Sequence, residues 1–564
     1  MTVRFPPKRS GVEILKGTSR LLRGTLAQEL AGGGTQVSED GYNLLKFHGT
    51  YEQYDRDTAT ALKQQGEEKD YQFMVRVRMP GGRLTAAQYL ALDDLAARHG
   101  NATLRLTTRQ GIQFHGVLKQ DLKSTIAAVN RTLLTTQAAC GDVVRNVMTS
   151  PAPVRDTVHA RLEADARRLS AALLPRSRAY HEIFLDETPY AGPEHEPLYG
   201  PTYLPRKFKI ALAIPEDNTV DVLANDLGFI LVFAGGRLLG YNVAIGGGLG
   251  MTHNRKDTYP RLATVVGSVG PDALVRATEA VIAFQRDYGN RADRKRARLK
   301  YVLDDLGQEA VVAHLARDYG LELAPPLPTP PLAVPDLLGW HPQGDGRWWL
   351  GVPVPSGRIE DTTDARLRTA LREAVERTGA VPTITPQQDV LLTDVAEGQR
   401  AELDRPLGDH GVVPASALTP LARWTLACPA LPTCGLALTE AERVRAPIVA
   451  GLQSALDQLG LGQERISLRI TGCPNGCARS YEGDIGLVGR IPGHFVIYVG
   501  GDFEGTVLAA QLLDRVKQAD IAPTLAPLFA QWGQTRQPAE AFGNWCRRVG
   551  LPALRAMLSR PAAA

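Results

Sequence analysis

Two closely spaced pairs of cysteines constrain this chain more than any other sequence feature. Cys428 and Cys434 are spaced Cys-x5-Cys, and Cys473 and Cys477 are spaced Cys-x3-Cys. The pairs hold four of the six cysteines among 564 residues, so their spacing disfavours two ordinary buried thiol pairs. Prolines and a glycine beside them favour turns that leave backbone N–H groups free. Four thiolates brought together in this way suit either a tetrahedral zinc ion or an iron–sulfur cluster.

The composition is that of a globular protein with several domains, and the net charge does not indicate a strongly charged partner. Hydrophobic residues make up 44% of the chain and charged residues 22%, with a net charge of only +4. No apolar run is long enough to span a bilayer, and the basic N-terminus lacks the apolar core of a secretory signal. A thiolate cluster fits a reducing compartment. We therefore expect a cytoplasmic protein without a membrane partner.

One strand–turn–helix–strand pattern occurs twice in the sequence. In the first copy, residues 73–79 alternate as in a strand, a turn follows, and residues 85–99 predict an amphipathic helix. A second strand is predicted over residues 103–117. Residues 349–359, a predicted helix at 363–379 and residues 383–390 repeat this order, although Gln387 stands where the first copy has Arg109. The sequence therefore predicts an internal duplication in which one copy keeps the chemical groups and the other mainly the shape.

Several basic residues lie where extended segments can aim them at one target. Arg76 lies on the strand 73–79, Arg145 ends a short loop, and Lys207 and Lys209 share one face of a strand that Arg206 opens. Taken singly, each is more often an ordinary surface charge. A converging set of four cations would suit a small multivalent oxyanion, because guanidinium groups add bidentate hydrogen bonds.

Three further signals are weaker. If the strand 103–117 stays extended, Arg109, Gln113 and His115 share one face, although a lone histidine is more often a packed residue than a ligand. The glycine-rich turn 246–253 lacks the lysine of a P-loop. Residues 291–300 include six basic residues on a predicted helix, which is either solvated or neutralises the carboxylates of a cofactor. Since the chain is nearly neutral and has no recognition module, we expect no nucleic-acid partner.

The order and spacing of these motifs resemble the siroheme-dependent sulfite and nitrite reductases. The motifs are the two cysteine pairs, Arg-x-Arg-x-Pro-Gly-Gly, Thr-Thr-Arg-Gln-x-x-Gln-x-His, Arg-Asn-Val and Arg-Lys-Phe-Lys, and the likeness runs from about Leu21 to beyond Gly501. Within the family the chain is similar to the hemoprotein (beta) subunits of assimilatory enzymes. The resemblance implies siroheme and a 4Fe–4S cluster as cofactors, and six-electron reduction of sulfite to sulfide for cysteine biosynthesis.

The resemblance also implies an α+β fold with two ferredoxin-like half-domains and two siroheme/iron–sulfur α/β modules around a central cofactor site. On this basis we divide the chain into five segments. They are an N-terminal arm at 1–54, a first ferredoxin-like repeat at 55–148, a first siroheme-binding module at 149–335 ending in a proline-rich linker, a second ferredoxin-like repeat at 336–420, and a 4Fe–4S/siroheme module at 421–564.

Site residues follow from the resemblance position by position. Cys428, Cys434, Cys473 and Cys477 would ligate the cluster, and Cys477 would also be the axial ligand of the siroheme iron. The substrate-side catalytic cations would be Arg76, Arg145, Lys207 and Lys209. The residues that contact siroheme would be Arg109, Gln113, His115, Arg206, Asn475 and Cys477.

The substrate and the electron donor are separate questions. Nitrite reductases of this family tend to have Lys-x-Asn where this chain has Lys207-Phe208-Lys209, which favours sulfite over a ferredoxin–nitrite reductase. No segment for flavin or NADPH is recognisable, so the donor would be another protein, either an NADPH-dependent flavoprotein alpha subunit or a ferredoxin. A zinc-stabilised binding protein, without enzymatic activity, is the alternative from another class.

Overall fold

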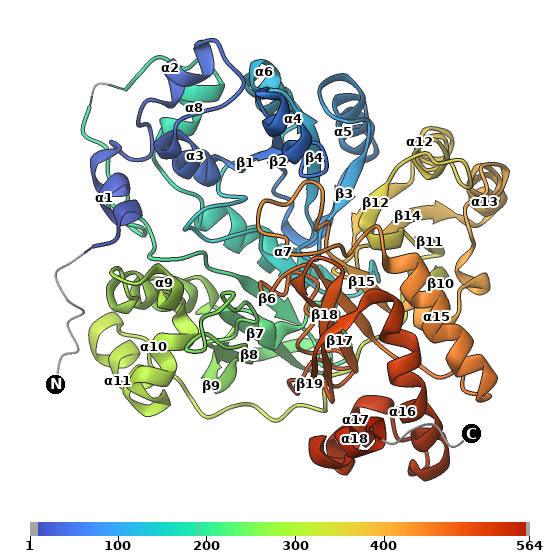
Figure 1. Ribbon diagram of the computed structural model, residues 1–564. Coiled ribbons are helices and arrows are strands. Elements are labelled where there is room, and N and C mark those ends of the chain that lie inside the picture. The colour runs from blue at the N-terminus through green and yellow to red at the C-terminus, as the bar shows by residue number, and fades with distance from the viewer. Residues whose placement is uncertain (1–8, 191, 560–564) are drawn as a thin grey trace.

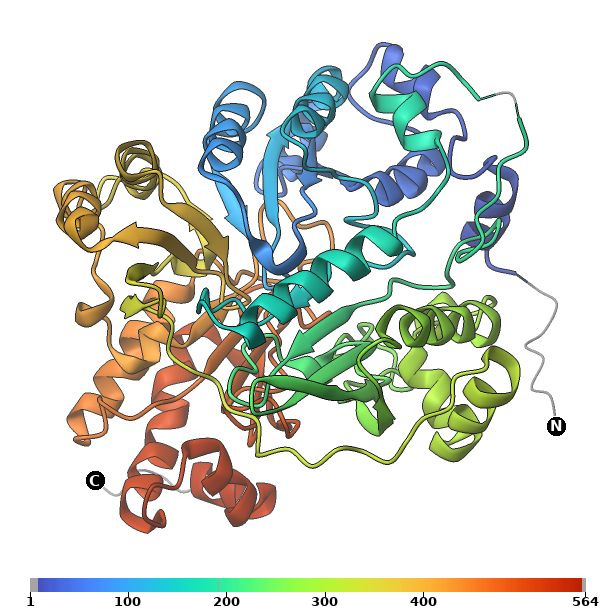
Figure 2. The same ribbon diagram turned by 180° about the vertical axis from the view of Figure 1, so that it is seen from behind.

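The computed structural model describes residues 9–190 and 192–559, and these residues form four β-sheets that meet around the centre of the molecule (Figures 1 and 2). One sheet lies in the blue N-terminal part, one in the green part, one in the yellow part and one in the orange-red C-terminal part. The sheets form two pairs of similar topology, and this pairing is the main architectural fact of the chain.

The first pair of sheets belongs to the two copies of the predicted repeat. Their strand orders are β1-β2-β4-β3-β12 and β10-β11-β14-β13, with neighbouring strands antiparallel. The strands are β1 (Thr50–Tyr54), β2 (Tyr71–Arg76), β3 (Leu104–Leu106), β4 (Ile112–Val117), β10 (Gly339–Pro342), β11 (Arg347–Val352), β12 (Arg358–Ile359), β13 (Val381–Ile384) and β14 (Val390–Ala396). The packed helices are α5 (Ala86–His99), α6 (Lys119–Arg131), α12 (Leu367–Thr378) and α13 (Arg400–Asp409).

Each repeat contributes backbone to the sheet of the other. β12 from the second repeat pairs with β3 of the first, and Arg83 from the first repeat pairs with Thr383 of β13. The turns that make this exchange need glycine, since Gly82 and Gly357 both have positive φ (76° and 73°). A Cβ on Gly82 would lie 2.3 Å from a carbonyl oxygen of the second repeat, and one on Gly357 would lie 2.5 Å from a carbonyl oxygen of the first. This reciprocity confirms the predicted duplication.

The second pair of sheets is duplicated as well. The strand orders are β5-β6-β7-β8-β9 and β15-β16-β17-β18-β19; in both, the first three strands are parallel and the last two antiparallel to their neighbours. The strands are β5 (Met148–Thr149), β6 (Ile210–Ala213), β7 (Leu227–Ala234), β8 (Arg237–Ile245), β9 (Thr264–Val269), β15 (Thr425–Ala427), β16 (Leu468–Thr471), β17 (Ile485–Ile491), β18 (His494–Val499) and β19 (Ala510–Lys517).

The α+β fold class with two duplicated units is therefore confirmed. The helices of the two modules are α7 (Thr157–Ala172), α8 (Ala179–Phe184), α9 (Leu274–Tyr288), α10 (Leu299–Leu306), α11 (Gln308–Tyr319), α14 (Pro420–Arg423), α15 (Arg445–Gln458), α16 (Ile521–Thr535), α17 (Phe542–Val549) and α18 (Leu551–Leu558). Residues 324–335 carry no helix or strand of their own and run as an extended linker between α11 and β10 (Figure 2). The residue boundaries of the five predicted segments stay a prediction.

Local sequence explains the start of α5. The Thr85 side chain accepts a hydrogen bond from the backbone N–H of Gln88 (3.1 Å), and the Gln88 side chain accepts one from the backbone N–H of Thr85 (2.9 Å). Tyr89, Leu92 and Leu95 of the predicted apolar stripe are buried. The predicted helix at 85–99 is therefore confirmed.

Two predicted elements are wrong. The strand expected over 103–117 is a hairpin, because β3 ends at Leu106 and β4 begins at Ile112; Thr107 accepts hydrogen bonds from the N–H groups of Arg109 (3.3 Å) and Gly111 (3.0 Å) in the turn between them. Arg109 thus lies on a turn. The helix expected over 291–300 is mostly irregular: a 3-10 turn covers Arg294–Arg296, and α10 begins at Leu299.

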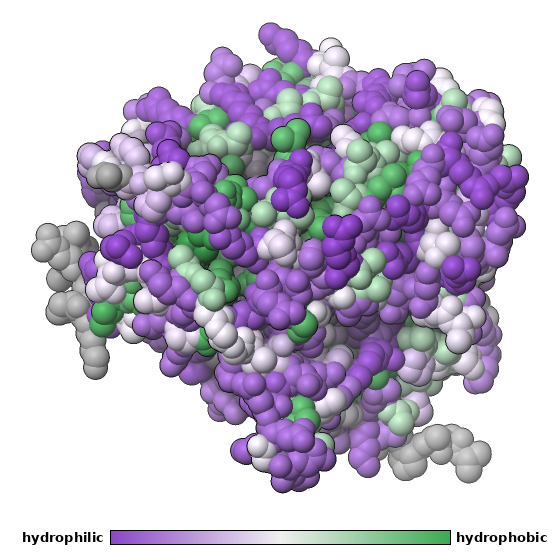
Figure 3. All heavy atoms as spheres, turned by 90° about the horizontal axis from the view of Figure 1, so that it is seen from above, coloured by the Kyte–Doolittle hydropathy of each residue, from purple (hydrophilic) through white to green (hydrophobic). Residues whose placement is uncertain are grey.

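The N-terminal arm is more structured than its polar sequence suggests. Helices α1 (Gly11–Thr18), α2 (Leu26–Ala31) and α3 (Glu39–Leu45) lie to the left of the blue sheet, and α4 (Ala59–Gln65) follows β1 (Figure 1). Among the described residues, no helix combines the length and the apolar character needed to cross a bilayer. Seen from above, the surface is mostly hydrophilic with small apolar patches (Figure 3).

Candidate functional site

The topology of the C-terminal sheet brings the two cysteine pairs to one edge. Cys428 follows β15, while Cys473 and Cys477 follow β16; the two strands are parallel, so their carboxyl ends lie side by side. The backbone N–H of Cys428 donates to the Ile470 carbonyl (3.1 Å), and the N–H of Gly472 donates to the Cys428 sulfur (3.3 Å). The fold therefore brings Cys428 to the edge where Cys473 and Cys477 lie, and the role of the four cysteines as ligands stays a prediction.

The four thiols are close enough to influence one another. Burial, and then the neighbouring cysteines, raise the pKa of Cys428 well above its usual range and that of Cys473 to about 12. Bare thiolates at this edge would repel one another, so a cationic centre is needed to hold them ionised. Within residues 9–190 and 192–559, no three Cys, His, Asp or Glu side chains converge as ligands of a single metal ion. The donor set of four cysteines fits a cluster with several iron atoms.

The segment that carries Lys207 and Lys209 is held beside the sheet of the green module, β5-β6-β7-β8-β9. Phe208 is fully buried and pairs with Val144, while the Arg145 N–H donates to the Phe208 carbonyl (2.9 Å). Because the segment is extended, Lys207 and Lys209 lie on the face opposite Phe208. Protein surrounds both amines, yet their side chains keep accessible surface, as expected of residues that line an interior space.

These lysines face a crowd of other cations. Burial, and then Lys209, Arg206 and Arg145, lower the pKa of Lys207 well below its usual range. Burial, and then Arg109 and Arg298, lower the pKa of Lys209 to about 7, whereas Cys477 acts to raise it. Lys209 is therefore near both the cationic group and Cys477. Asp226 pairs with Arg298 and Asp142 lies near Arg206. The other cations of the group, Arg109, Arg145, Lys207 and Lys209, have no ion-pair partner among the described residues, so the group would attract an anion.

Arg76 and Gln113 face each other across β2 and β4, where their backbones are paired. When the Gln113 amide is turned so that its oxygen faces Arg76, that oxygen accepts from Arg76 Nε (3.1 Å). Arg76 Nη1 also donates to the sulfur of Cys140 (3.0 Å), and Arg145 donates to the Ala139 carbonyl (3.2 Å) and the Gly141 carbonyl (2.9 Å). Both arginines are thus oriented by the loop that contains Cys140.

Arg109 is less available than the sequence suggested. Its Nη1 donates to the Asn225 side chain (2.8 Å), and its Nη2 donates to the carbonyls of Asn146 (2.7 Å) and Ile210 (3.0 Å). Only Nε lacks a partner. Arg109 therefore fixes the hairpin turn against the green module and adds positive charge there. The same turn reaches the cysteine edge, since Thr108 donates to the Cys477 carbonyl (3.0 Å).

The surroundings of His115 are the clearest indication of a ligand-binding site. Both ring nitrogens are buried without a hydrogen-bond partner, which a protein interior rarely tolerates unless a ligand completes the site. Burial, and then Arg358, Arg105 and Arg76, lower the pKa of His115 well below its usual range, so the ring is neutral. The free ring N–H group of His115 and the arginines around it fit a macrocycle that bears several carboxylates.

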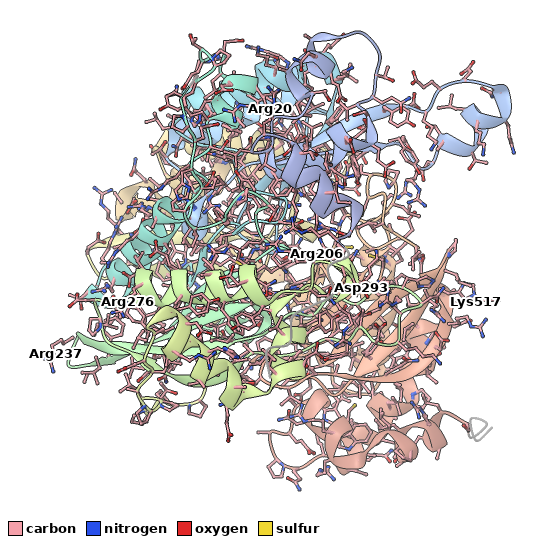
Figure 4. All side chains as sticks on the ribbon, turned by 90° about the vertical axis from the view of Figure 1, so that its left-hand side faces the viewer. Arg20, Arg206, Arg237, Arg276, Asp293 and Lys517 are labelled. Atoms are coloured by element: carbon pink, nitrogen blue, oxygen red, sulfur yellow. The ribbon has the colours of Figure 1, made fainter. Side chains whose placement is uncertain are left out.

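Asp142 is a buried carboxylate at the centre of the cationic group, and sequence reasoning did not single it out. It is buried and accepts from Arg294 (Nη2–Oδ1, 2.8 Å), with Lys16 at 3.6 Å and Arg206 at 3.8 Å. Burial opposes ionisation, but Arg294 and Lys16 hold the pKa of Asp142 below its usual range. Lys16 comes from α1 and is itself paired with Glu13. The side view shows Arg206 between the N-terminal elements and the green module (Figure 4). The only sequence signal was the spacing of Glu13 and Lys16, one helical turn apart.

The glycine-rich turn 246–253 lies against the second cysteine pair. Met251 donates its N–H to the Pro474 carbonyl (2.9 Å), and a Cβ on Gly250 would lie 3.1 Å from the carbonyl oxygen of Asn475. Asn475 in turn donates to the sulfur of Cys473 (3.5 Å). Lys300, from the basic run, holds the turn through the carbonyls of Gly248 (2.9 Å) and Gly250 (3.0 Å), so it is not on a solvated face.

Comparisons with known proteins agree with this geometry. The family model for the nitrite and sulphite reductase 4Fe–4S domain matches residues 164–322, and that for the nitrite/sulfite reductase ferredoxin-like half domain matches residues 64–131 and 341–409. The 4Fe–4S model thus matches the first module, which has no cysteine pair. The second module, which duplicates its sheet, carries both pairs. The two half-domain matches fall on the first pair of sheets, which exchange backbone segments with each other.

Proteins from several organisms are similar over nearly the whole chain. The sulfite reductase (NADPH) hemoprotein beta-component of Xanthomonas campestris is 47% identical over 96% of this chain and 97% of its own. The sulfite reductase (ferredoxin) of Synechococcus elongatus is 43% identical over 98% of this chain and 91% of its own. The solved structure of the Mycobacterium tuberculosis NirA protein is 24% identical over 97% of this chain and 98% of its own, with a TM-score of 0.78, and it shares the fold. The chain belongs to the siroheme- and 4Fe–4S-dependent nitrite/sulfite reductase family.

Proposed function

We propose that this protein is an assimilatory sulfite reductase hemoprotein that reduces sulfite to sulfide. The observation that carries the proposal is the position of Lys209, whose amine is close enough to Arg109, Arg298 and Cys477 for all three to shift its pKa. An anion in the interior space would therefore meet fixed positive charge beside the residues assigned to the cofactors. The names and the identity of the relatives support the same activity.

The chain supplies the residues for both cofactors. Cys428, Cys434, Cys473 and Cys477 would hold the 4Fe–4S cluster, and Cys477 would also bind the siroheme iron. When bound, these groups store and deliver electrons one at a time. The residues that would surround the macrocycle are Arg109, Gln113, His115, Arg206 and Asn475, with His115 donating its free ring N–H group.

Arg76, Arg145, Lys207 and Lys209 would bind the sulfite oxygens. Sulfite is an anion that must approach an electron-rich centre, so fixed donors are needed to bind it and to stabilise charge on the departing oxygen. The overall reaction balances as HSO3⁻ + 6 e⁻ + 6 H⁺ giving HS⁻ + 3 H2O. Each oxygen leaves as water, and an amine with a pKa of about 7 is suited to give and regain protons at neutral pH.

Electrons would arrive from a separate protein, either an NADPH-dependent flavoprotein or a ferredoxin, and the protein would work in the cytoplasm. Relatives named for each donor have similar identity to this chain. Steady-state sulfite reduction with reduced ferredoxin, compared with NADPH plus a flavoprotein, decides between them. Nitrite as a competing substrate in the same assay measures the preference for sulfite.

The substrate role is tested by Lys209→Asn, with Lys295→Asn as the control, because Lys295 is exposed and outside the interior space. We expect Lys209→Asn to lower sulfite turnover by about 10²–10³-fold while the siroheme absorption and the iron content stay near those of the parent. Equal loss of siroheme would show that Lys209 holds the cofactor instead. A colourless protein that contains zinc would refute the proposed function as a whole.

A further inference from the structure

A second cluster of ionisable groups lies where the two duplicated modules meet. The loops 214–226 and 472–484 connect equivalent strands, β6 to β7 and β16 to β17, and have the same length. Asp221 and Arg479 hold corresponding places in these loops and pair with each other (Nη1–Oδ2, 2.7 Å). Arg479 and Glu482 belong to the same loop as Cys473 and Cys477. This cluster is therefore tied to the cysteine edge by the backbone.

The cluster is sealed from solvent. Asp221 and Glu482 are both 0% exposed, and Arg469 and Arg479 are 4% and 6% exposed. Arg469 lies 3.7 Å from Asp221, and it is near enough to Asp484 to lower the pKa of that group against the effect of burial. Arg479 also donates to the carbonyls of Thr219 (3.0 Å) and Pro386 (2.8 Å), and to the Gln387 side chain (3.1 Å).

The two carboxyl groups of the cluster lie close together. Glu482 lies near Asp221, and neither of its oxygens finds a hydrogen-bond partner among the described residues although the side chain is fully buried. A fully buried carboxylate without a hydrogen-bond donor is costly to ionise, and two like charges close together in a dry interior disfavour double ionisation. Burial, and then Asp221, also raise the pKa of Glu482 well above its usual range.

We propose that Asp221 and Glu482 share one buried proton, and that this proton makes the uptake of electrons at the adjoining cysteine edge depend on pH. With one proton on the acid pair, the two arginines leave a net charge of about +1. Removal of the proton makes these four groups neutral, and it lowers the local charge by one whatever the charge of the neighbouring Asp484. Positive charge favours the electron-rich form of a neighbouring centre, so the protonated pair favours reduction, and reduction in turn holds the proton more tightly.

This inference rests on the proposed function only for the identity of the centre that is reduced. Six electrons and six protons enter in the balanced reaction, and a buried acid pair next to the electron path allows the two to be taken up together. The step is Glu482–COO⁻ + H⁺ giving Glu482–COOH as one electron is added from the donor protein. No bond to the substrate forms or breaks in it.

The test uses Glu482→Gln in the purified holoenzyme, with Glu309→Gln at an exposed site as the control. The introduced amide keeps the shape of the protonated acid and can donate to Asp221. Infrared spectra should show a carboxylic-acid C=O band in the parent and in the control, and the band should be absent in Glu482→Gln. Asp221→Asn should lose the same band, because Glu482 then ionises beside two arginines.

Redox titration of the cluster at several pH values supplies the second readout. We expect the parent potential to fall with rising pH, by at most about 59 mV per unit for a one-electron couple. The Glu482→Gln potential should match that of the parent at low pH and stay flat. A potential independent of pH in the parent, a positive shift in Glu482→Gln at low pH, or an unchanged C=O band would overturn the proposal. A preparation without iron refutes the proposed function, while the infrared result still decides the shared proton.

Discussion

The charged amine of Lys209 should lower the free energy of unfolding of the chain when the cofactors are absent. Its pKa falls from 10.5 to about 7, chiefly by burial and then by Arg109 and Arg298. Each unit corresponds to about 1.4 kcal/mol, which gives an upper bound on the order of 5 kcal/mol. Because the side chain keeps some access to solvent, we expect about 2–4 kcal/mol. Replacement of the amine by an uncharged group should therefore stabilise the cofactor-free protein.

The pH dependence has a definite sign. Below pH 7, Lys209 is charged in both the folded and the unfolded states, so the full penalty applies. Between pH 7 and 10.5 the unfolded chain binds more protons, so the free energy of unfolding rises with pH and the penalty disappears. Lys209→Met should thus exceed the parent in stability most at about pH 6, and the difference should shrink steadily toward about pH 10.

Urea unfolding of the cofactor-free proteins at about pH 6, 8 and 9.5 measures this difference, with Lys295→Met as the exposed control. The same substitution should lower kcat/KM for sulfite in the holoenzyme, since function and stability then oppose each other at one residue. A Lys209→Met protein that is less stable than the parent at about pH 6, or a difference that does not change with pH, would refute the reasoning.

Three further outcomes follow from other contacts. Asp93→Ala should destabilise the protein by about 3–5 kcal/mol in urea unfolding, because buried Asp93 joins α5 to Arg368 (3.1 Å) and Arg372 (2.9 Å) of α12; retention of full stability would contradict this. Asp142→Asn should weaken siroheme retention at least tenfold, measured by absorption after gel filtration, because Arg206 and Arg294 lose their common anchor; unchanged retention would argue against that role. Cys477→Ser should lower both iron content and siroheme absorption, whereas Cys546→Ser, a buried thiol away from the cysteine edge, should leave both unchanged; equal losses would remove the special role of Cys477.

The sequence predicted the fold best where a local pattern is decisive. The capping residues around Thr85 and the apolar stripe after it specify α5 through contacts within one helix turn or two. The duplication was visible because both copies keep the glycines that the exchanged turns need at positive φ. The hairpin at 104–117 was missed, since its alternating residues look the same in one long strand as in two short strands around a turn.

In the candidate site, too, the residues with a local sequence pattern were predicted and those without one were missed. The two cysteine pairs were identified by spacing alone, whereas Asp142, Lys16 and Glu482 were not, because polar residues scattered along a chain carry no local signal of burial. The exchange of β12 and Arg83 between repeats also has no local signature.

The order of residues along the chain specifies the set of chemical groups: four thiols in two pairs, and basic residues at fixed spacings on short extended segments. Which of these groups face one another is set by the fold alone. Parallel pairing of β15 and β16 places Cys428 beside Cys473 and Cys477, and the packing of the hairpin turn places Arg109 against Asn225. The physical reason is that electrostatic interactions depend on separation in space and on burial, and long-range packing sets both.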